Sequence, residues 1–454
     1  MPTDKLNLDF LPRHLTLLLE QEKKSEIQAL LSQFRPEDVA EILLQLEEEQ
    51  IRQVLTWIDA ELASELVIHI DSDYWHELLT PLNETRLVEI IEELPSDEAA
   101  DLLNELDDEL SEKILESQAN SESFRNLSNL LQYPDDAAGA LMNPDIVYVP
   151  ESLNTDQALA MIRENIESFK DINYIYITDE KQRLTGVLPL PSLIAAPHQS
   201  LIEEVMSRDV IAVDVMMDED DVVDIVRKYE LMTVPVIDVH QRLIGIITVD
   251  DIMDVMEEQA DEEAYKMAAL GDPDNQSSAF EAAMARIPWL LVCLGGSMSA
   301  GTIIHLYQST LEQAIVLASF MPAVMGMAGN TGVQTSTLLI RNMGGGPTPR
   351  HFLWRMVLQE FRTAFVIGLL CGSIASSVAF FLFHANPWIG GVIGLSLCLS
   401  ILFSTFLGTS IPFLFQKFSI DPAVASGPFV TTINDSTALI IYLGIASAIL
   451  PFLH

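Results

Sequence analysis

The stretch Ala425–Tyr442, ASGPFVTTINDSTALIIY, lies in the last of several long apolar segments and carries one carboxylate, Asp435. A charge in the hydrocarbon region of a membrane is costly, so an ionisable residue there is typical of an ion path. The small and hydroxyl-bearing residues around Asp435 allow close helix packing and supply oxygen ligands. We predict that Pro428 breaks or kinks the helix near the acid. The alternative is a structural carboxylate bonded to a neighbouring helix.

Charge divides the chain into two unlike parts. Its 454 residues carry 67 acidic and 24 basic side chains, a formal net charge of −43, yet 49% of residues are hydrophobic. From Ser277 onward there are only six basic and five acidic residues. A strongly acidic soluble part therefore precedes a nearly neutral apolar part. The acidity argues against nucleic acid as a partner and suits multivalent cations, unless it serves solubility alone.

Several function classes find no support in the sequence. The cysteines Cys293, Cys371 and Cys398 lie in apolar segments, without the spacing of a zinc site or a disulfide framework. The polar start, MPTDKLNLDF, does not resemble a signal peptide. We find no nucleophile elbow, phosphate-binding loop or metal-hydrolase motif, so we predict that the protein is not an enzyme.

The first 132 residues predict a helical domain. Apolar residues recur at helical spacing in RPEDVAEILLQLEEEQIRQVLTWI (residues 35–58) and again in NETRLVEIIEELPSDEAADLLNELDDELSEKIL (residues 83–115). Each unit has one apolar stripe that it cannot bury alone. We therefore expect the units to stack into a small helical superhelix.

An internal repeat of roughly sixty residues follows. LMNPDIVYVPESL is echoed by VMSRDVIAVDVMM, and each copy continues with a helix, a pair of strands ending at a glycine (Gly186, Gly245) and a second helix. This order resembles a tandem CBS pair, a module that often binds adenine nucleotides. Thr248 and Asp251 match the family's ribose-binding position, whereas the first copy has PLPSL there. The resemblance implies at most one nucleotide cleft, ATP being the expected ligand, and an empty cleft is the alternative.

Acidic residues are dense in the second repeat and beyond it. DDIMDVMEEQADEE (residues 250–263) predicts a helix on which Asp251, Asp254 and Glu258 share one face. Like charges at that spacing repel unless a counter-ion lies between them. A second acidic group occurs at residues 218–224. The alternative interpretation is a solvated helix.

The remaining sequence predicts five membrane spans, at residues 287–308, 314–340, 360–383, 388–415 and 424–452. With a cytoplasmic N-terminus, all six basic residues of this part fall on the cytoplasmic side. Within the second span, MPAVMGMAGNTGVQTSTLLIR (residues 321–341) has glycines and amides at mid-membrane. These favour either a locally opened helix that lines a pore or a helix-packing face.

The whole chain resembles the MgtE magnesium channel family. The motifs that carry the resemblance are YPDDAAGALM (residues 133–142), MGMAGNTGVQ (residues 325–334) and DPAVASGPFVTTIND (residues 421–435). It implies a multi-domain membrane protein with a helical superhelix N domain, an α/β tandem CBS pair, a connecting plug helix and a five-helix α transmembrane domain. We place the boundaries at 1–132, 133–200, 201–258, 259–284 and 285–454.

The resemblance also implies a homodimer in the cell (inner) membrane, with Asp435 as the pore carboxylate that holds a hydrated Mg²⁺ ion. The implied pore-lining residues are Gly329, Asn330, Gly427, Thr431 and Thr432. The implied Mg²⁺-sensing acids are Glu65, Asp97, Asp101, Asp218, Asp220, Glu230, Asp251, Asp254, Glu262 and Asp421. The chain departs from certain relatives at Gln259, Gln308, Val333 and Gly427.

The expected function is a Mg²⁺-selective channel gated by intracellular Mg²⁺. Mg²⁺ prefers oxygen ligands and dehydrates reluctantly, so one carboxylate with hydroxyls can bind it through its waters. Divalent ions that bridge the cytosolic acids would stabilise the closed state. Two alternatives stay open: a transporter of Mn²⁺ or Co²⁺, and a membrane-anchored sensor that transports nothing.

Overall fold

The computed structural model describes residues 11–118, 121–165, 173–268, 270, 278–343, 350–418, 420–422 and 427–452. The chain forms two compact units, Met1–Met256 and Glu257–His454, and each is described by itself.

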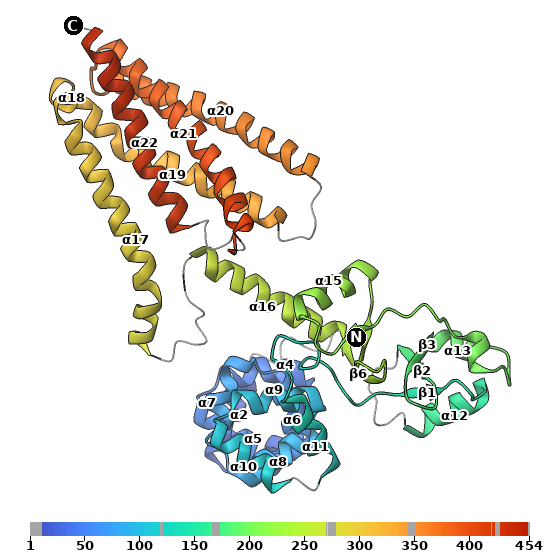
Figure 1. Cartoon of the computed structure of the whole chain (residues 1–454). Coiled ribbons are helices and arrows are strands. Elements are labelled where there is room, and N and C mark those ends of the chain that lie inside the picture. Colours follow the sequence, from blue (N-terminus) through green and yellow to red (C-terminus); the bar gives the residue numbers. More distant parts are fainter. Residues whose placement is uncertain are drawn as a thin grey trace. The chain divides into compact units, whose positions relative to one another are not determined.

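In the described part of the first unit, ten short helices form the helical domain (Figure 1). Their apolar stripes meet in one core, in which Leu15, Leu55 and Leu87 are fully buried. This arrangement confirms the predicted stack of amphipathic helices. The helices are α2 (Leu11–Glu20), α3 (Lys24–Leu31), α4 (Pro36–Leu43), α5 (Glu48–Trp57), α6 (Ala60–Ile68), α7 (Trp75–Leu79), α8 (Glu84–Glu93), α9 (Ser96–Glu105), α10 (Asp108–Ser117) and α11 (Glu122–Leu130).

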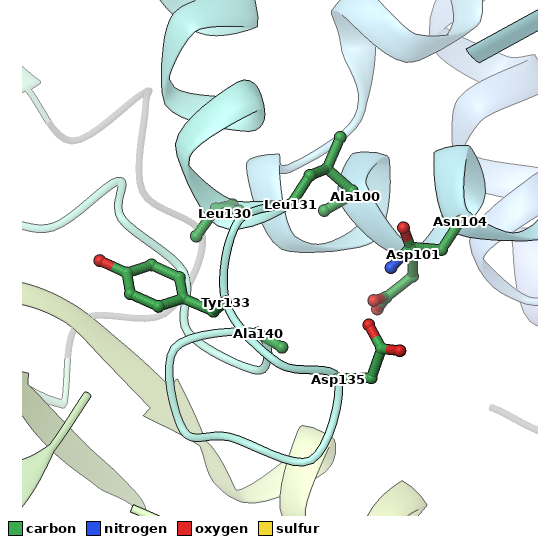
Figure 2. Close-up of a pocket in the computed structure, with 8 residues that line it drawn as sticks. All are labelled: Ala100, Asp101, Asn104, Leu130, Leu131, Tyr133, Asp135 and Ala140. Carbon is green, nitrogen blue, oxygen red and sulfur yellow. The ribbon is translucent and has the colours of Figure 1, made fainter. Parts of the chain in front are cut away.

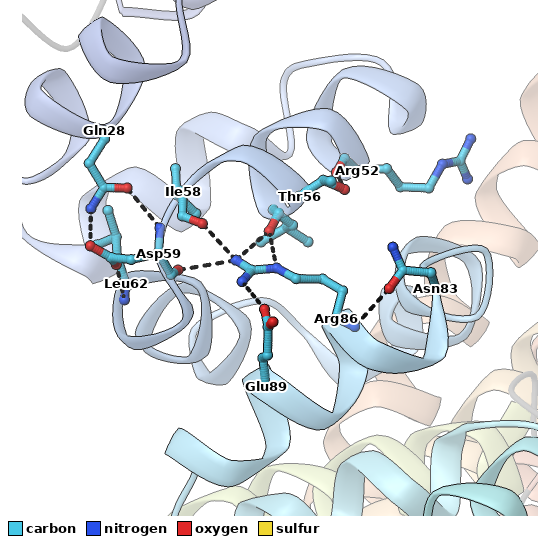
Figure 3. A network of polar contacts seen from close by, with 10 residues as sticks. Gln28, Arg52, Thr56, Ile58, Asp59, Leu62, Asn83, Arg86 and Glu89 are labelled. Atoms are coloured by element: carbon cyan, nitrogen blue, oxygen red, sulfur yellow. Dashed lines mark hydrogen bonds and ion pairs between the residues drawn. The ribbon is translucent and has the colours of Figure 1, made fainter.

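A buried arginine fixes one junction of the stack. The Arg86 guanidinium donates hydrogen bonds to the carbonyls of Leu55, at 2.9 and 2.8 Å, and of Ile58, at 2.8 Å. It also bonds the Asp59 carbonyl at 3.1 Å and pairs with Glu89 at 2.9 Å (Figure 3). The last carbonyls of a helix lack partners within it, and Arg86 of α8 satisfies those at the end of α5.

Two three-stranded sheets confirm the internal repeat. In each sheet the first strand is parallel to the second, and the second is antiparallel to the third. The first repeat contains β1 (Tyr148–Pro150), α12 (Thr155–Asn165), β2 (Tyr174–Thr178), β3 (Leu184–Pro189) and α13 (Leu190–Ala195). The second contains α14 (Ile202–Val205), β4 (Val213–Asp214), α15 (Glu219–Tyr229), β5 (Thr233–Ile237) and β6 (Leu243–Thr248).

The repeat glycines lie inside β3 and β6 rather than at the ends of the strands. A Cβ at Gly245 would lie 2.6 Å from the Met142 sulfur, and one at Gly186 would collide with Met206. Met142 precedes the first sheet but packs on the second, and Met206, which precedes the second sheet, packs on the first. The segment before each sheet therefore packs on the other repeat, and a glycine makes room for it.

Five helices of the second unit are long and apolar enough to cross a membrane. α22 packs against α17, α19 and α21, whereas α20 packs mainly against α21 (Figure 1). The five predicted spans are confirmed as helices. They are α17 (Ala279–Leu306), α19 (Val316–Met343), α20 (Arg350–Phe381), α21 (Pro387–Lys417) and α22 (Pro428–Ile449), with the short α18 (Gln308–Gln313) after the first and the 3₁₀ turn η4 (Leu450–Phe452) after the last.

Two details of the membrane part differ from expectation. Pro428 occupies the first turn of α22, where a missing N–H costs nothing, so the predicted kink near Asp435 is wrong. α19 is continuous through its glycines, so of the two interpretations of this stretch the local opening is wrong. The segment before the membrane forms α16 (Val249–Ala268), a helix that continues across the predicted boundary at residues 258/259.

Candidate ion path and acidic clusters

Asp435 lies on α22 opposite the small residues of α19. A Cβ at Gly329 would be 3.5 Å from Asp435 Oδ1 and 3.6 Å from Thr431 Cγ2. Asp435 is half-buried, and within the part of the chain that the structure describes it makes no hydrogen bond or ion pair. The alternative of a structural carboxylate required a bond to a neighbouring helix, and the described residues provide none. A half-buried acid of this kind can hold a cation through water.

The other predicted pore-lining residues divide into two groups. Thr432 faces Gly296 of α17, where any larger side chain would collide with it. Thr431 donates a hydrogen bond to the Gly427 carbonyl at 3.1 Å. These residues therefore lie on or directly before α22, the helix of Asp435, whereas Asn330 lies on α19 and is exposed.

The glycine-rich part of α19 also serves as a packing face. A Cβ at Gly332 would collide with the Asn434 amide and lie 2.6 Å from Ser404 Oγ. A Cβ at Gly408 of α21 would lie 2.5 Å from the Gly332 carbonyl. Asn434 is 1% exposed, and neither of its amide atoms has a partner among the described residues. Gly332 of the GNTG motif thus allows α19, α21 and α22 to pack closely together.

Two predicted sensor acids of the second unit converge on a lysine. Lys266 Nζ lies 2.7 Å from Glu262 Oε2 and 3.6 Å from Asp421 Oδ2. Beside this ion pair, Gly427 lets the Met267 carbonyl at the end of α16 approach the start of α22. The cation between these acids is therefore the ammonium of Lys266, a residue that the sequence interpretation did not consider.

A second acidic group lies in the first unit, on α9 and the start of α16. Burial, followed by the neighbouring charges of Asp97, Asp101, Asp251 and Asp254, raises the pKa of Glu98 to about 8. Burial also raises the pKa of Asp97. Four of these acids, Asp97, Asp101, Asp251 and Asp254, come from the predicted sensor set. We call residues Asp97, Glu98, Asp101, Asp251 and Asp254 the α9–α16 cluster.

Asp101 reaches a further carboxylate. It faces Asp135 across a small cavity of about 10 Å³, which Asn104 and Tyr133 also line (Figure 2). Loss of hydration among its neighbours, followed by the charges of Asp97 and Asp251, raises the pKa of Asp101 to about 7. The residue itself remains exposed, so an ion from solvent can reach this end of the cluster.

The predicted ribose-binding pair is also in place. Thr248 donates to Asp251 Oδ2 from its backbone nitrogen at 2.9 Å and from its hydroxyl at 2.6 Å. The pKa of Asp251 is raised to about 7, chiefly by burial; the bonds from Thr248 oppose the rise and the Asp97 charge contributes to it. Thr248 therefore holds Asp251 next to the α9 acids.

Comparison with known proteins agrees with this architecture. The chain matches the family models "MgtE intracellular N domain" at residues 34–136, "CBS domain" at 138–198 and 202–258, and the MgtE model "Divalent cation transporter" at 321–445. It is 36% identical over 341 residues to "Magnesium transporter MgtE" of Bacillus subtilis (strain 168), covering 75% of this chain and 74% of that relative. The chain belongs to the MgtE family. It is therefore a member of a transport family rather than an enzyme family, as predicted.

Further relatives support the same assignment. "Magnesium transporter MgtE" of Thermus thermophilus is 34% identical over 324 residues, 71% of this chain and 72% of its own length. Among solved structures, "Crystal structure of the cytosolic domain of the Mg2+ channel MgtE in complex with ATP" matches with a TM-score of 0.51 at 31% identity. The match covers 54% of this chain and 99% of that one.

The remaining predicted sensor acids of this MgtE chain do not gather. Asp218 caps α15 by accepting a hydrogen bond from the Asp220 nitrogen at 3.1 Å, and Glu230 ends α15 in a left-handed conformation. Glu65 of α6 makes no hydrogen bond or ion pair within the described ranges. Across those ranges, no three acidic, histidine or cysteine side chains are close enough to form a ready-made metal site.

Sequence reasoning missed three charged residues of these sites, and two of them had a signal. Glu98 is next to the predicted sensor Asp97, and Asp135 is inside the YPDDAAGALM motif. Lys266 gave no signal, because its role depends on the approach of the end of α16 to Asp421.

Proposed function

We propose that this MgtE-family chain transports Mg²⁺ through a path that passes Asp435. The half-buried carboxylate, which has Gly329 and Thr431 beside it within membrane-spanning helices, carries the proposal. One carboxylate with nearby hydroxyl and carbonyl oxygens suits an ion that keeps most of its waters, and a weak site allows the ion to leave. The Mg²⁺ transport named for the relatives supports the choice of ion.

Uptake into proteoliposomes tests the path. We expect Mg²⁺ uptake by the native chain and its loss in both Asp435→Ala and Asp435→Asn, because each removes the charge. Thr437→Ala, two residues further along α22, is the matched control and should transport normally. Uptake by Asp435→Asn equal to that of the native chain would move the ion path away from α22.

We further propose that intracellular Mg²⁺ closes the path by binding to the α9–α16 cluster. The raised pKa values of Glu98, Asp101 and Asp251 support this proposal, because they reflect negative charges held together at a cost. A divalent ion relieves that repulsion. It stabilises the packed arrangement by as much as its affinity for that arrangement exceeds its affinity for the loosened one. When Mg²⁺ is scarce the acids repel, and the arrangement loosens.

Neutralising two members of the cluster tests the closure. Asp251→Asn combined with Asp254→Asn should leave uptake insensitive to internal Mg²⁺, while uptake at low Mg²⁺ stays as in the native chain. Glu257→Gln with Asp261→Asn is a matched control, with two exposed acids of α16 changed outside the cluster. Normal closure in the first double variant would contradict a sensing role for the cluster.

Further parts of the proposal concern assembly and ligands. We propose a homodimer in the cell membrane with a cytoplasmic N-terminus, which the basic residues at one end of the spans support. ATP is the proposed ligand of the second CBS repeat, supported by the ATP complex of the similar cytosolic domain and by the pairing of Thr248 with Asp251. Isothermal titration of the native chain and of Thr248→Val with ATP tests this assignment.

A further inference from the structure

An apolar groove runs between α20 and α21. Its volume is about 490 Å³, and aromatic side chains from both helices form its walls. The lining residues include Trp354, Val357 and Phe361 of α20, and Phe406, Thr409 and Phe413 of α21. The Thr409 hydroxyl is used within its own helix, donating to the Phe406 carbonyl at 2.9 Å, so the wall offers little free polarity.

The groove ends below a basic side chain. Lys417 follows Phe413 by four residues on α21, so it lies on the groove face one turn nearer the membrane surface. Lys417 is exposed and makes no ion pair among the described residues. On α20, Arg355 is exposed in the same turn as Trp354, which is 65% exposed. A tryptophan beside basic residues is typical of the boundary between hydrocarbon and head groups.

The nearest acid of α20 does not oppose this charge. The Glu360 carboxylate is hydrogen-bonded by Thr335 of α19, and α19 is not part of the groove wall. The groove therefore has an apolar length and one cationic end. From Trp354 to Phe361, and from Phe406 to Phe413, the helical rise is about 10 Å, which fits the upper part of an acyl chain in one leaflet.

The location also argues against a second copy of the chain as the occupant. α20 packs mainly on α21 and contributes little to the contacts of α22, the helix that carries Asp435. The groove is thus formed by a helix at the edge of the bundle, whereas a pore shared between two copies would lie along α22.

We propose that this groove is a binding site for one acyl chain of an anionic phospholipid, with the phosphate of the head group at Lys417. The site is separate from the transport path and does not depend on the function proposed above. A basic residue at the membrane surface contributes about fivefold to the binding of an anionic lipid.

Native mass spectrometry of the full chain tests the proposal, with phosphatidylglycerol and phosphatidylcholine offered in equal amounts. We expect the native chain to retain phosphatidylglycerol in preference to phosphatidylcholine. Lys417→Gln should lose this preference by about fivefold. Val357→Trp fills the groove and should retain neither lipid. The controls are Arg341→Gln, at the end of α19, and Leu370→Trp, at an exposed position elsewhere on α20.

Each outcome decides the question. Retention of phosphatidylglycerol unchanged by both Lys417→Gln and Val357→Trp would overturn the proposal. So would a change of oligomeric state in Val357→Trp without loss of lipid, because the groove would then be a contact between copies. Mg²⁺ uptake by the variants in phosphatidylcholine vesicles checks that they fold. The lipid comparison itself does not use uptake, so it is judged separately from the transport proposal.

Discussion

Glu98→Gln should make the cytosolic part more stable at pH 8 and flatten its dependence on pH. The pKa of Glu98 is raised from an ordinary 4.5 to about 8 by burial and by the surrounding carboxylates. Between these two values the folded chain binds a proton that the unfolded chain has released, so the free energy of unfolding falls as pH rises. Below pH 4.5 this contribution is fully present, and above pH 8 it is lost.

The structure also sets the size of the effect. A pKa difference of this kind corresponds to at most about 4 to 5 kcal/mol. Glu98 keeps part of its surface in water, and screening reduces the amount, so we expect a change of about 2 kcal/mol across this window. Glutamine keeps the shape of the side chain and is neutral throughout. Asp101 and Asp251, whose pKa values are each raised to about 7, should leave some slope in the variant.

Urea unfolding of residues 1–268 measures this slope. The fragment contains the first unit and all of α16, and its only tryptophans, Trp57 and Trp75, lie in the helical domain and report its unfolding. The titration runs from pH 5 to pH 8.5 without divalent ions, and is repeated at pH 8 with Mg²⁺. Mg²⁺ should stabilise the native fragment more than the variant, because the variant has less charge to neutralise.

A matched variant and a clear negative result complete the test. Glu116→Gln changes an exposed glutamate of α10 outside the cluster and should leave the slope as in the native fragment. Parallel pH curves for the native fragment and Glu98→Gln would refute the reasoning. Lower stability of Glu98→Gln at pH 8 would refute it as well. The interactions lost with the carboxylate would then outweigh the charge repulsion that its removal relieves.

Three further predictions concern other parts of the chain. Gly332→Ala should destabilise the membrane part by about 1–3 kcal/mol and lower its melting temperature, because the new methyl group collides with Asn434; an unchanged melting temperature would show that the helices separate freely. Arg86→Met should lower the unfolding free energy of the fragment by about 2–4 kcal/mol, measured in urea, since three carbonyls lose their buried donor. Lys266→Gln should raise the internal Mg²⁺ needed to halve uptake by about two- to fivefold, because Glu262 and Asp421 then repel; a lower requirement would contradict this account.

The periodicity of apolar residues predicted most of the fold, because each element buries apolar residues that recur at a regular spacing. The short helices of the first domain have one apolar stripe each, and the two sheets recur in the sequence as they do in the structure. The spans follow from length and hydropathy alone. The expected kink at Pro428 was wrong, and the glycines in α19 left two interpretations open, for one reason. A proline or glycine signals a break only if the helix continues on both sides of it or lacks a neighbour to pack on. Pro428 begins a helix, and Gly332 is needed by Asn434 and Ser404.

The acidic sites were harder to predict, because a carboxylate's role depends on which other charges approach it. Sequence alone treats Asp218, Asp220 and Glu230 like Asp97, Asp101 and Asp251, since all are acids near turns or helix ends. The fold separates the two sets. The first set caps and ends α15 at the surface, where water solvates the charges. The second set meets where α9 faces the start of α16.

The cost of gathering charge is what distinguishes a sensing cluster from a solvated acidic surface. At the end of α16, Lys266 neutralises Glu262 and Asp421, so a divalent ion has little repulsion to relieve there. In the α9–α16 cluster the main causes of the pKa shifts of Glu98 and Asp101 are burial and neighbouring acids. An ion that binds to the second group therefore gains more free energy than one that binds to the first. It follows that Mg²⁺ sensitivity should reside mainly in the α9–α16 cluster, and that the Lys266 contact should set only how much Mg²⁺ is required.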